Sequence, residues 1–139
     1  MKHRLSTENF TIEIEINIFE QEIDYPINST LNIYVESDKF GARTTMDIDI
    51  KEFAVFVRNL KHLYDFLDGS ARLEEAYSIY NYIEFLGTGN GHIVVKGCLN
   101  NHCRNGFEQE LSFENEFDQT YLKIFVKELY QFYKKYLHK

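Results

Sequence analysis

The sequence contains no tryptophan and a single proline, Pro26, together with only seven glycines in 139 residues. Flexible linkers and disordered segments are rich in proline, glycine and polar residues, so this composition argues against a long linker. No stretch has the roughly 20 consecutive apolar residues that a membrane-spanning helix requires. The first ten residues carry positive charge, but no apolar segment follows, as it does in a secretory signal. We therefore expect a soluble, cytoplasmic protein with no membrane partner.

Cysteine is also scarce, and Cys98 and Cys103 are too few for a disulfide framework. His92 and His102 lie in the same region, and zinc favours four nitrogen or sulfur ligands. The histidines follow no familiar zinc spacing, so a buried Cys98 thiol followed by a polar hairpin loop is the preferred interpretation. A small ligand- or metal-binding site within residues 92–103 remains the alternative.

Motifs of catalysis and phosphate binding are missing as well. The chain has no G-x-S-x-G nucleophile motif. The glycine-rich segment GTGNG at residues 87–91 lacks the Lys-Ser/Thr that follows a phosphate-binding loop, and its Asn-Gly pair is typical of a tight hairpin turn. We therefore expect neither an enzyme nor a bound cofactor.

Acidic residues outnumber basic ones, with 22 Asp and Glu against 15 Lys and Arg, which gives a net charge of −7. A net acidic chain is a poor general binder of nucleic acid, because such binding depends largely on neutralising phosphates. The same charge favours association with a basic partner.

Two periodicities divide the chain. Alternation of apolar and polar residues predicts strands, most clearly in FTIEIEINI, where every second residue is apolar. The predicted strands are residues 10–19, 31–37, 42–48, 77–86, 93–99 and 107–114. A period of 3.6 predicts a helix whose apolar stripe runs from Phe53 to Leu67 and a second whose stripe runs from Leu122 to Leu137.

The ends of these helices have recognisable signals. Asp49 followed by Glu52 predicts a capping box before the first helix. Gly69 stands where a left-handed residue is expected to end it. Asp118 is expected to cap the second helix.

The order is three strands, a helix, three strands and a helix. Strands joined by short turns pair antiparallel, and two amphipathic helices each require an apolar surface. We expect one α+β domain spanning residues 1–139, with an antiparallel sheet of about six strands and both helices on one face.

Three carboxylates close together, Glu114, Glu116 and Asp118, raise the possibility of a metal or proton-transfer site. Each also has a structural explanation: an outward strand position, a turn and a helix cap. The structural explanation is favoured.

The sheet face opposite the helices is expected to carry carboxylates mixed with tyrosines. Tyrosine is enriched at protein interfaces, so this face is the candidate partner-binding surface. A solvated sheet face without a partner is the alternative. The residues assigned to the face are Glu13, Glu15, Tyr34, Glu36, Tyr80, Tyr82, Glu84, Glu108 and Glu110.

The segments GHIVVKG and LSFENEFDQTYLKIFVKEL resemble the pattern of the WapI-type immunity proteins. Other matching features are Phe40-Gly41, Leu67-Asp68-Gly69 followed by Ala71 and Leu73, the spacing from Gly91 to Gly97, and Asp118-Gln119-Thr120. The resemblance implies a bacterial protein that neutralises a cognate toxin domain by binding it, with no active site of its own. A basic toxin, such as a nuclease, would suit the acidic charge. The oligomeric state is left open.

Overall fold

The computed structural model describes residues 1–76, 81–102 and 105–138. Within these residues, four strands precede a first helix, and four more separate it from a second. The first strands are β1 (Lys2–Ser6), β2 (Phe10–Ile18), β3 (Ser29–Ser37) and β4 (Phe40–Ile48), followed by α1 (Ile50–Phe66). The later strands are β5 (Ser70–Glu74), β6 (Tyr82–Gly87), β7 (His92–His102) and β8 (Glu108–Asp118), followed by α2 (Leu122–Tyr133).

The α+β class is confirmed, but the prediction of one sheet of about six strands is wrong. The strands form two antiparallel four-stranded sheets, ordered β1-β2-β3-β4 and β5-β6-β7-β8. The two unpredicted strands, β1 and β5, are short, and each buries only two side chains. His3 and Leu5 point inward from β1, and Ala71 and Leu73 from β5. In each strand only the leucine is large and apolar, so the alternation of apolar and polar residues is too weak to predict a strand.

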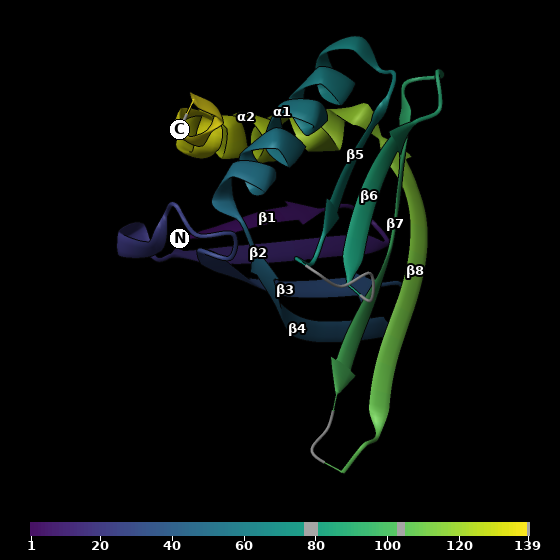
Figure 1. Cartoon of the computed structure of the whole chain (residues 1–139). Coiled ribbons are helices and arrows are strands. Elements are labelled where there is room, and N and C mark those ends of the chain that lie inside the picture. Colours follow the sequence, from purple (N-terminus) through teal and green to yellow (C-terminus); the bar gives the residue numbers. More distant parts are fainter. Residues whose placement is uncertain (77–80, 103–104, 139) are drawn as a thin grey trace.

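The β7–β8 hairpin is longer than predicted. β7 continues to His102, three residues beyond its predicted end, and β8 continues to Asp118 rather than ending at residue 114. Asn100 pairs with Glu110 in the extended part of the ladder. In Figure 1 this hairpin extends beyond β4, so that its tip lies at one end of the molecule and the helices lie at the other.

The two sheets run across one another rather than side by side (Figure 1). Hydrogen bonds join them directly: Thr44 Oγ1 donates to the Asn100 carbonyl at 3.0 Å, and Asn115 Nδ2 donates to Ser37 Oγ at 2.7 Å. Just beyond β5, the Ala76 N–H donates to the Asp47 carbonyl at 2.9 Å, and the Asp47 N–H donates to the Glu75 carboxylate at 3.2 Å. These contacts place the free edge of β4 against the second sheet.

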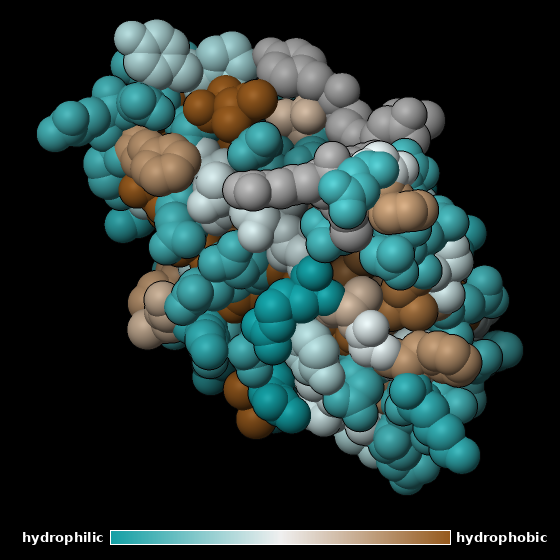
Figure 2. Space-filling view, turned by 90° about the horizontal axis from the view of Figure 1, so that it is seen from below, coloured by the Kyte–Doolittle hydropathy of each residue, from teal (hydrophilic) through white to brown (hydrophobic). Residues whose placement is uncertain are grey.

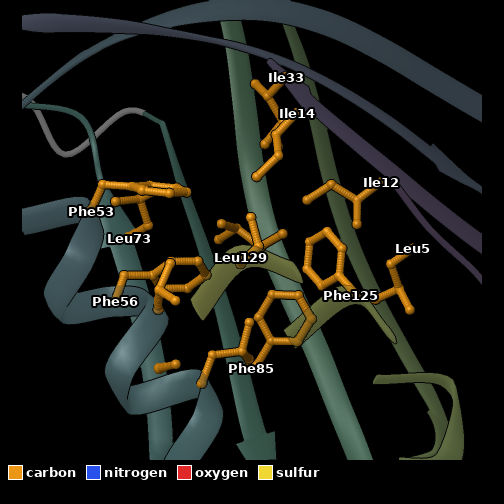
Figure 3. Packing of buried hydrophobic residues seen from close by; sticks show 14 of the residues in the cluster. Leu5, Ile12, Ile14, Ile33, Phe53, Phe56, Leu73, Phe85, Phe125 and Leu129 are labelled. Carbon is orange, nitrogen blue, oxygen red and sulfur yellow. The ribbon is translucent and has the colours of Figure 1, made fainter. Parts of the chain in front are cut away.

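The helices occupy different positions from those predicted, because two sheets are present. α1 packs on β5 and β6 of the second sheet, α2 packs beside β1 of the first, and the helices pack on each other. The side chains between them form one continuous apolar cluster, to which both sheets and both helices contribute. Figure 3 shows part of this cluster, with Phe53 and Phe56 of α1 on one side and Phe125 of α2 on the other. The ring centres of Phe56 and Phe85 of β6 lie 6.2 Å apart. Each buried phenylalanine contributes about 1.5–3 kcal/mol to folding.

The start of α1 is held by side chains. The Asp49 carboxylate accepts a hydrogen bond from the Lys51 N–H at 2.9 Å, the geometry of an N-cap. The side-chain amide of the fully buried Asn28 donates from Nδ2 to Asp49 at 3.1 Å, and its Oδ1 accepts from the Ile50 N–H at 2.8 Å. The strand-to-helix corner is therefore fixed by a satisfied polar network.

The end of α1 differs in detail from the expectation. The residue in the left-handed conformation at the C-cap is Leu67, with φ of 59°, and its N–H donates to the Leu63 carbonyl. Gly69 has φ of 89° two residues later. Its carbonyl accepts from the Gly87 N–H, so Gly69 begins the pairing of β5 with β6 rather than ending the helix.

No helix among residues 1–76, 81–102 and 105–138 is both long and apolar enough to cross a membrane.

Candidate interaction surface

The residues of the predicted partner-binding face are divided between the two sheets. Glu13 and Glu15 lie on β2 and Tyr34 and Glu36 on β3, whereas Tyr82 and Glu84 lie on β6 and Glu108 and Glu110 on β8. Tyr80 lies outside the described residues. The expectation of one wide face assumed a single sheet, so the division follows directly from the fold.

The extended β7–β8 hairpin nevertheless brings some of these residues together. A hollow of about 530 Å³ on the outer side of the first sheet is lined by Glu13, Glu15 and Tyr34. An adjoining hollow of about 280 Å³ is lined by Glu110. The two hollows share Arg43, Thr44 and Asn101, and together we call them the β4–hairpin cleft.

Figure 2 views the molecule from the side on which β4 and the hairpin tip lie in Figure 1. Hydrophilic residues cover most of this face, and hydrophobic groups stand among them singly or in small clusters. Phe40, at the start of β4, lines the second hollow and is 67% exposed. A polar rim around isolated aromatic groups is the composition of a protein–protein contact surface.

Arg43 is one of several cleft residues that were not predicted from the sequence. Its guanidinium lies over the Tyr34 ring, 4.8 Å from the ring centre. The Tyr34 hydroxyl donates to Glu36 at 2.7 Å, and this bond is the main reason that the pKa of Tyr34 is raised. The alternation of β4, with Thr44 and Met46 inward, was the signal that puts Arg43 on the outer face beside Tyr34.

Several of the predicted carboxylates already have cationic neighbours. Glu13 lies 3.7 Å from Lys2 and 3.4 Å from Arg4. Glu84 lies 3.9 Å from Arg72 and 3.8 Å from Lys96. The outer faces are therefore mixed in charge, and exposed ion pairs of this kind contribute little to stability.

The alternative site at residues 92–103 is not assembled by the part of the chain that the structure describes. His92 and Cys98 stand six residues apart on β7, or roughly 20 Å at the rise of a strand. His92 contacts Glu116 at 2.7 Å, and no group of three possible metal ligands occurs among the described residues. Cys103 and the His102 side chain lie outside them.

Cys98 is not the buried thiol that was expected. Because Gly97 and Leu99 point inward, the alternation of β7 turns Cys98 to the outer face, where it is half-buried. Its thiol donates to Glu110 at 2.9 Å. The pKa of the thiol is raised, mainly by partial burial and secondly by this hydrogen bond, so the unreactive protonated form is favoured.

A second polar cluster joins β1 to α2. His3 is 1% exposed, with Nδ1 lying 2.5 Å from Glu128 Oε1 and Nε2 lying 2.8 Å from the Tyr133 hydroxyl. Burial raises the pKa of Tyr133 to about 12. A tyrosine held protonated cannot act as a base, and a histidine so enclosed has no room for a substrate. The cluster fixes the edge strand to the helix.

The three carboxylates near the end of β8 have separate positions. Asp118 accepts from the Thr120 N–H at 2.9 Å, and this bond lowers the pKa of its carboxyl group. Glu116 contacts His92, and Glu114 lies across the ladder from Lys96. The chain then turns through a short 3-10 segment, Gln119–Tyr121, into α2.

Comparison with protein families shows that residues 3–137 match the model described as the Immunity protein WapI-like family. Comparisons with curated proteins and with solved structures found no match. Within the described residues, the family match covers β2 to β8, both α-helices and all of β1 but its first residue. The chain therefore belongs to the WapI-like immunity protein family.

Proposed function

We propose that this chain protects a bacterial cell by binding a cognate toxin domain and blocking the toxin's active surface. The observation that carries the proposal is the family match over residues 3–137. It is supported by the described residues, which provide surfaces for contact but no nucleophile paired with a base in a cavity. Neutralisation would then be stoichiometric, and the chain would act by binding in the cytoplasm rather than by catalysis.

The β4–hairpin cleft is the proposed contact surface. It combines the Tyr34 ring, stacked under Arg43, with the exposed Phe40 and with polar side chains from both sheets. Tyrosine and arginine are the residues most often found among the dominant contributors to binding energy at interfaces. Because the cleft joins the two sheets, a partner seated there would contact both.

The charge of the chain points to a basic partner, such as a nuclease domain whose own substrate is anionic. At a net charge of −7, long-range attraction would speed the encounter. Glu15 and Glu110 are the carboxylates best placed to test this, since both line the cleft and neither takes part in the ion pairs of Glu13 and Glu84.

The test uses a toxin domain encoded beside this chain, purified and immobilised. Charge reversal in the double variant Glu15→Lys and Glu110→Lys should slow association about tenfold at low salt, with a smaller effect at high salt. The matched control is Glu8→Lys with Glu22→Lys, which changes the net charge equally at exposed positions outside the cleft. Equal association rates for the two double variants would remove the cleft from the proposal while leaving toxin binding intact.

A further inference from the structure

A basic groove lies between the two helices, at the end of the molecule opposite the hairpin tip (Figure 1). It has a volume of about 320 Å³. Lys61 lines it from α1, Lys123 and Lys127 line it from α2, and Lys134 lies just beyond α2. Among its described lining residues, Asp65 is the single carboxylate. A concentration of four ammonium groups is unexpected on a chain whose net charge is −7.

The floor of the groove differs in character from its rim. Tyr64 and Val126 form part of the lining together with the half-buried Tyr130 ring. The ammonium groups of Lys61 and Lys134 lie 5.3 Å and 5.7 Å from the centre of that ring. Apolar and aromatic surface inside a charged rim is the arrangement of a recognition site for an amphipathic segment.

The groove already holds one carboxylate in the way that a ligand would be held. Asp65 accepts a hydrogen bond from Lys61 Nζ at 2.6 Å, and this bond raises the pKa of Lys61. Among the described residues, Lys123 and Lys127 on the rim make no ion pair within 4.0 Å. They are therefore placed to accept further carboxylates.

We propose that this α1–α2 groove binds an acidic segment of a partner protein, one that places an apolar or aromatic side chain between carboxylates. The side chain would pack on Tyr130, and the carboxylates would contact Lys123, Lys127 and Lys134. This site is additional to the β4–hairpin cleft and does not depend on the proposed immunity function.

The charge distribution favours a short segment over an extended polyanion. Nucleic acid and an anionic bilayer both present charge over an area larger than the groove, and would approach the acids of the remaining surface. A short acidic segment in a concave groove meets mainly the lysines, because at physiological salt charges more than about 8 Å apart are largely screened.

The experiment measures binding of a fluorescein-labelled peptide in which glutamates flank a phenylalanine and a leucine, using the full chain. A peptide with glutamine in place of glutamate is the first control. The chain variant Lys123→Glu with Lys127→Glu is compared with Lys39→Glu with Lys51→Glu, which changes net charge equally outside the groove. Circular dichroism establishes that both variants are folded, and Lys123→Gln with Lys127→Gln provides a milder second pair.

We expect the acidic peptide to bind at least about tenfold more tightly than its glutamine counterpart, and the Lys123/Lys127 variant to lose about tenfold in affinity. The Lys39/Lys51 variant should stay within about twofold of the original. No binding, or equal losses in both variants, would overturn the proposal. It would also be overturned if the lysines governed binding to phosphatidylglycerol vesicles or single-stranded DNA but not to the peptide, or if sedimentation showed self-association through the groove.

Discussion

Replacing Gly97 with alanine should destabilise the protein, because the site has no room for a methyl group. An added Cβ would stand 2.5 Å from the Tyr82 carbonyl oxygen and 2.7 Å from Phe113 Cζ. Phe113 pairs with Gly97 across the β7–β8 ladder, and its ring stacks on Phe10 of the first sheet, with ring centres 5.7 Å apart. The glycine therefore gives the ring the space through which the two sheets pack.

The size of the effect follows from two opposing contributions. Overpacking a core position costs about 1–3 kcal/mol, and here the Tyr82 carbonyl belongs to the β6–β7 ladder and cannot move freely. Alanine also restricts the unfolded chain, which offsets about 0.4–1 kcal/mol. We expect a net loss of about 1–2 kcal/mol, equivalent to a fall in Tm of roughly 3–8 °C for a protein of this size.

Thermal and urea unfolding followed by circular dichroism measure this change, and Gly41→Ala is the matched control. Gly41 also lies in a strand, but a Cβ there would meet its nearest atoms at 3.7 Å, an ordinary contact. The control should stay within about 0.5 kcal/mol of the original protein. Equal stability of the two variants would refute the reasoning from close packing at Gly97.

Three further predictions concern polar groups. The pKa of Tyr133 rises from 10.0 to about 12 on folding, so the folded state holds the proton more tightly and the free energy of unfolding falls between pH 10 and 12. In Tyr133→Phe, the free energy of unfolding measured across this pH range should fall by less. A profile identical to that of the original protein would contradict this. Asp118→Ala should lower the Tm at pH 7 with a difference that shrinks as the pH falls below 3.8, because the depressed pKa of Asp118 contributes stability only while the carboxyl is ionised. Metal analysis of purified protein should find no stoichiometric zinc, and zinc that disappears on substitution of Cys98 would restore the alternative at residues 92–103.

The long alternating and helical segments could be predicted from the sequence, and the pairing of the sheets could not. β2 and β3 bury every second residue over most of their length, so the period of two is unambiguous. β1 and β5 lack this signal because only one of the two inward residues in each strand is large and apolar. The other is the polar His3 in β1 and the small Ala71 in β5. Whether eight strands form one sheet or two depends on contacts between distant segments, such as Phe10 with Phe113.

The same limit applies to the candidate surface. Outward positions such as Glu13 and Tyr34 follow from alternation alone, but their grouping with Glu110 depends on the β7–β8 hairpin reaching past β4. The cationic partners of Glu13 come from β1, a strand that the sequence did not indicate. The part of the predicted face that borders the hairpin is therefore a cleft of mixed charge.

The central claim is that the chain neutralises a toxin domain by forming a one-to-one complex with it. The most direct test titrates the activity of a toxin domain encoded beside this chain with increasing amounts of the purified protein. We predict a linear loss of activity that is complete at an equimolar ratio. Full inactivation by a small fraction of an equivalent would indicate catalysis, and unchanged activity at excess protein would contradict the immunity function itself.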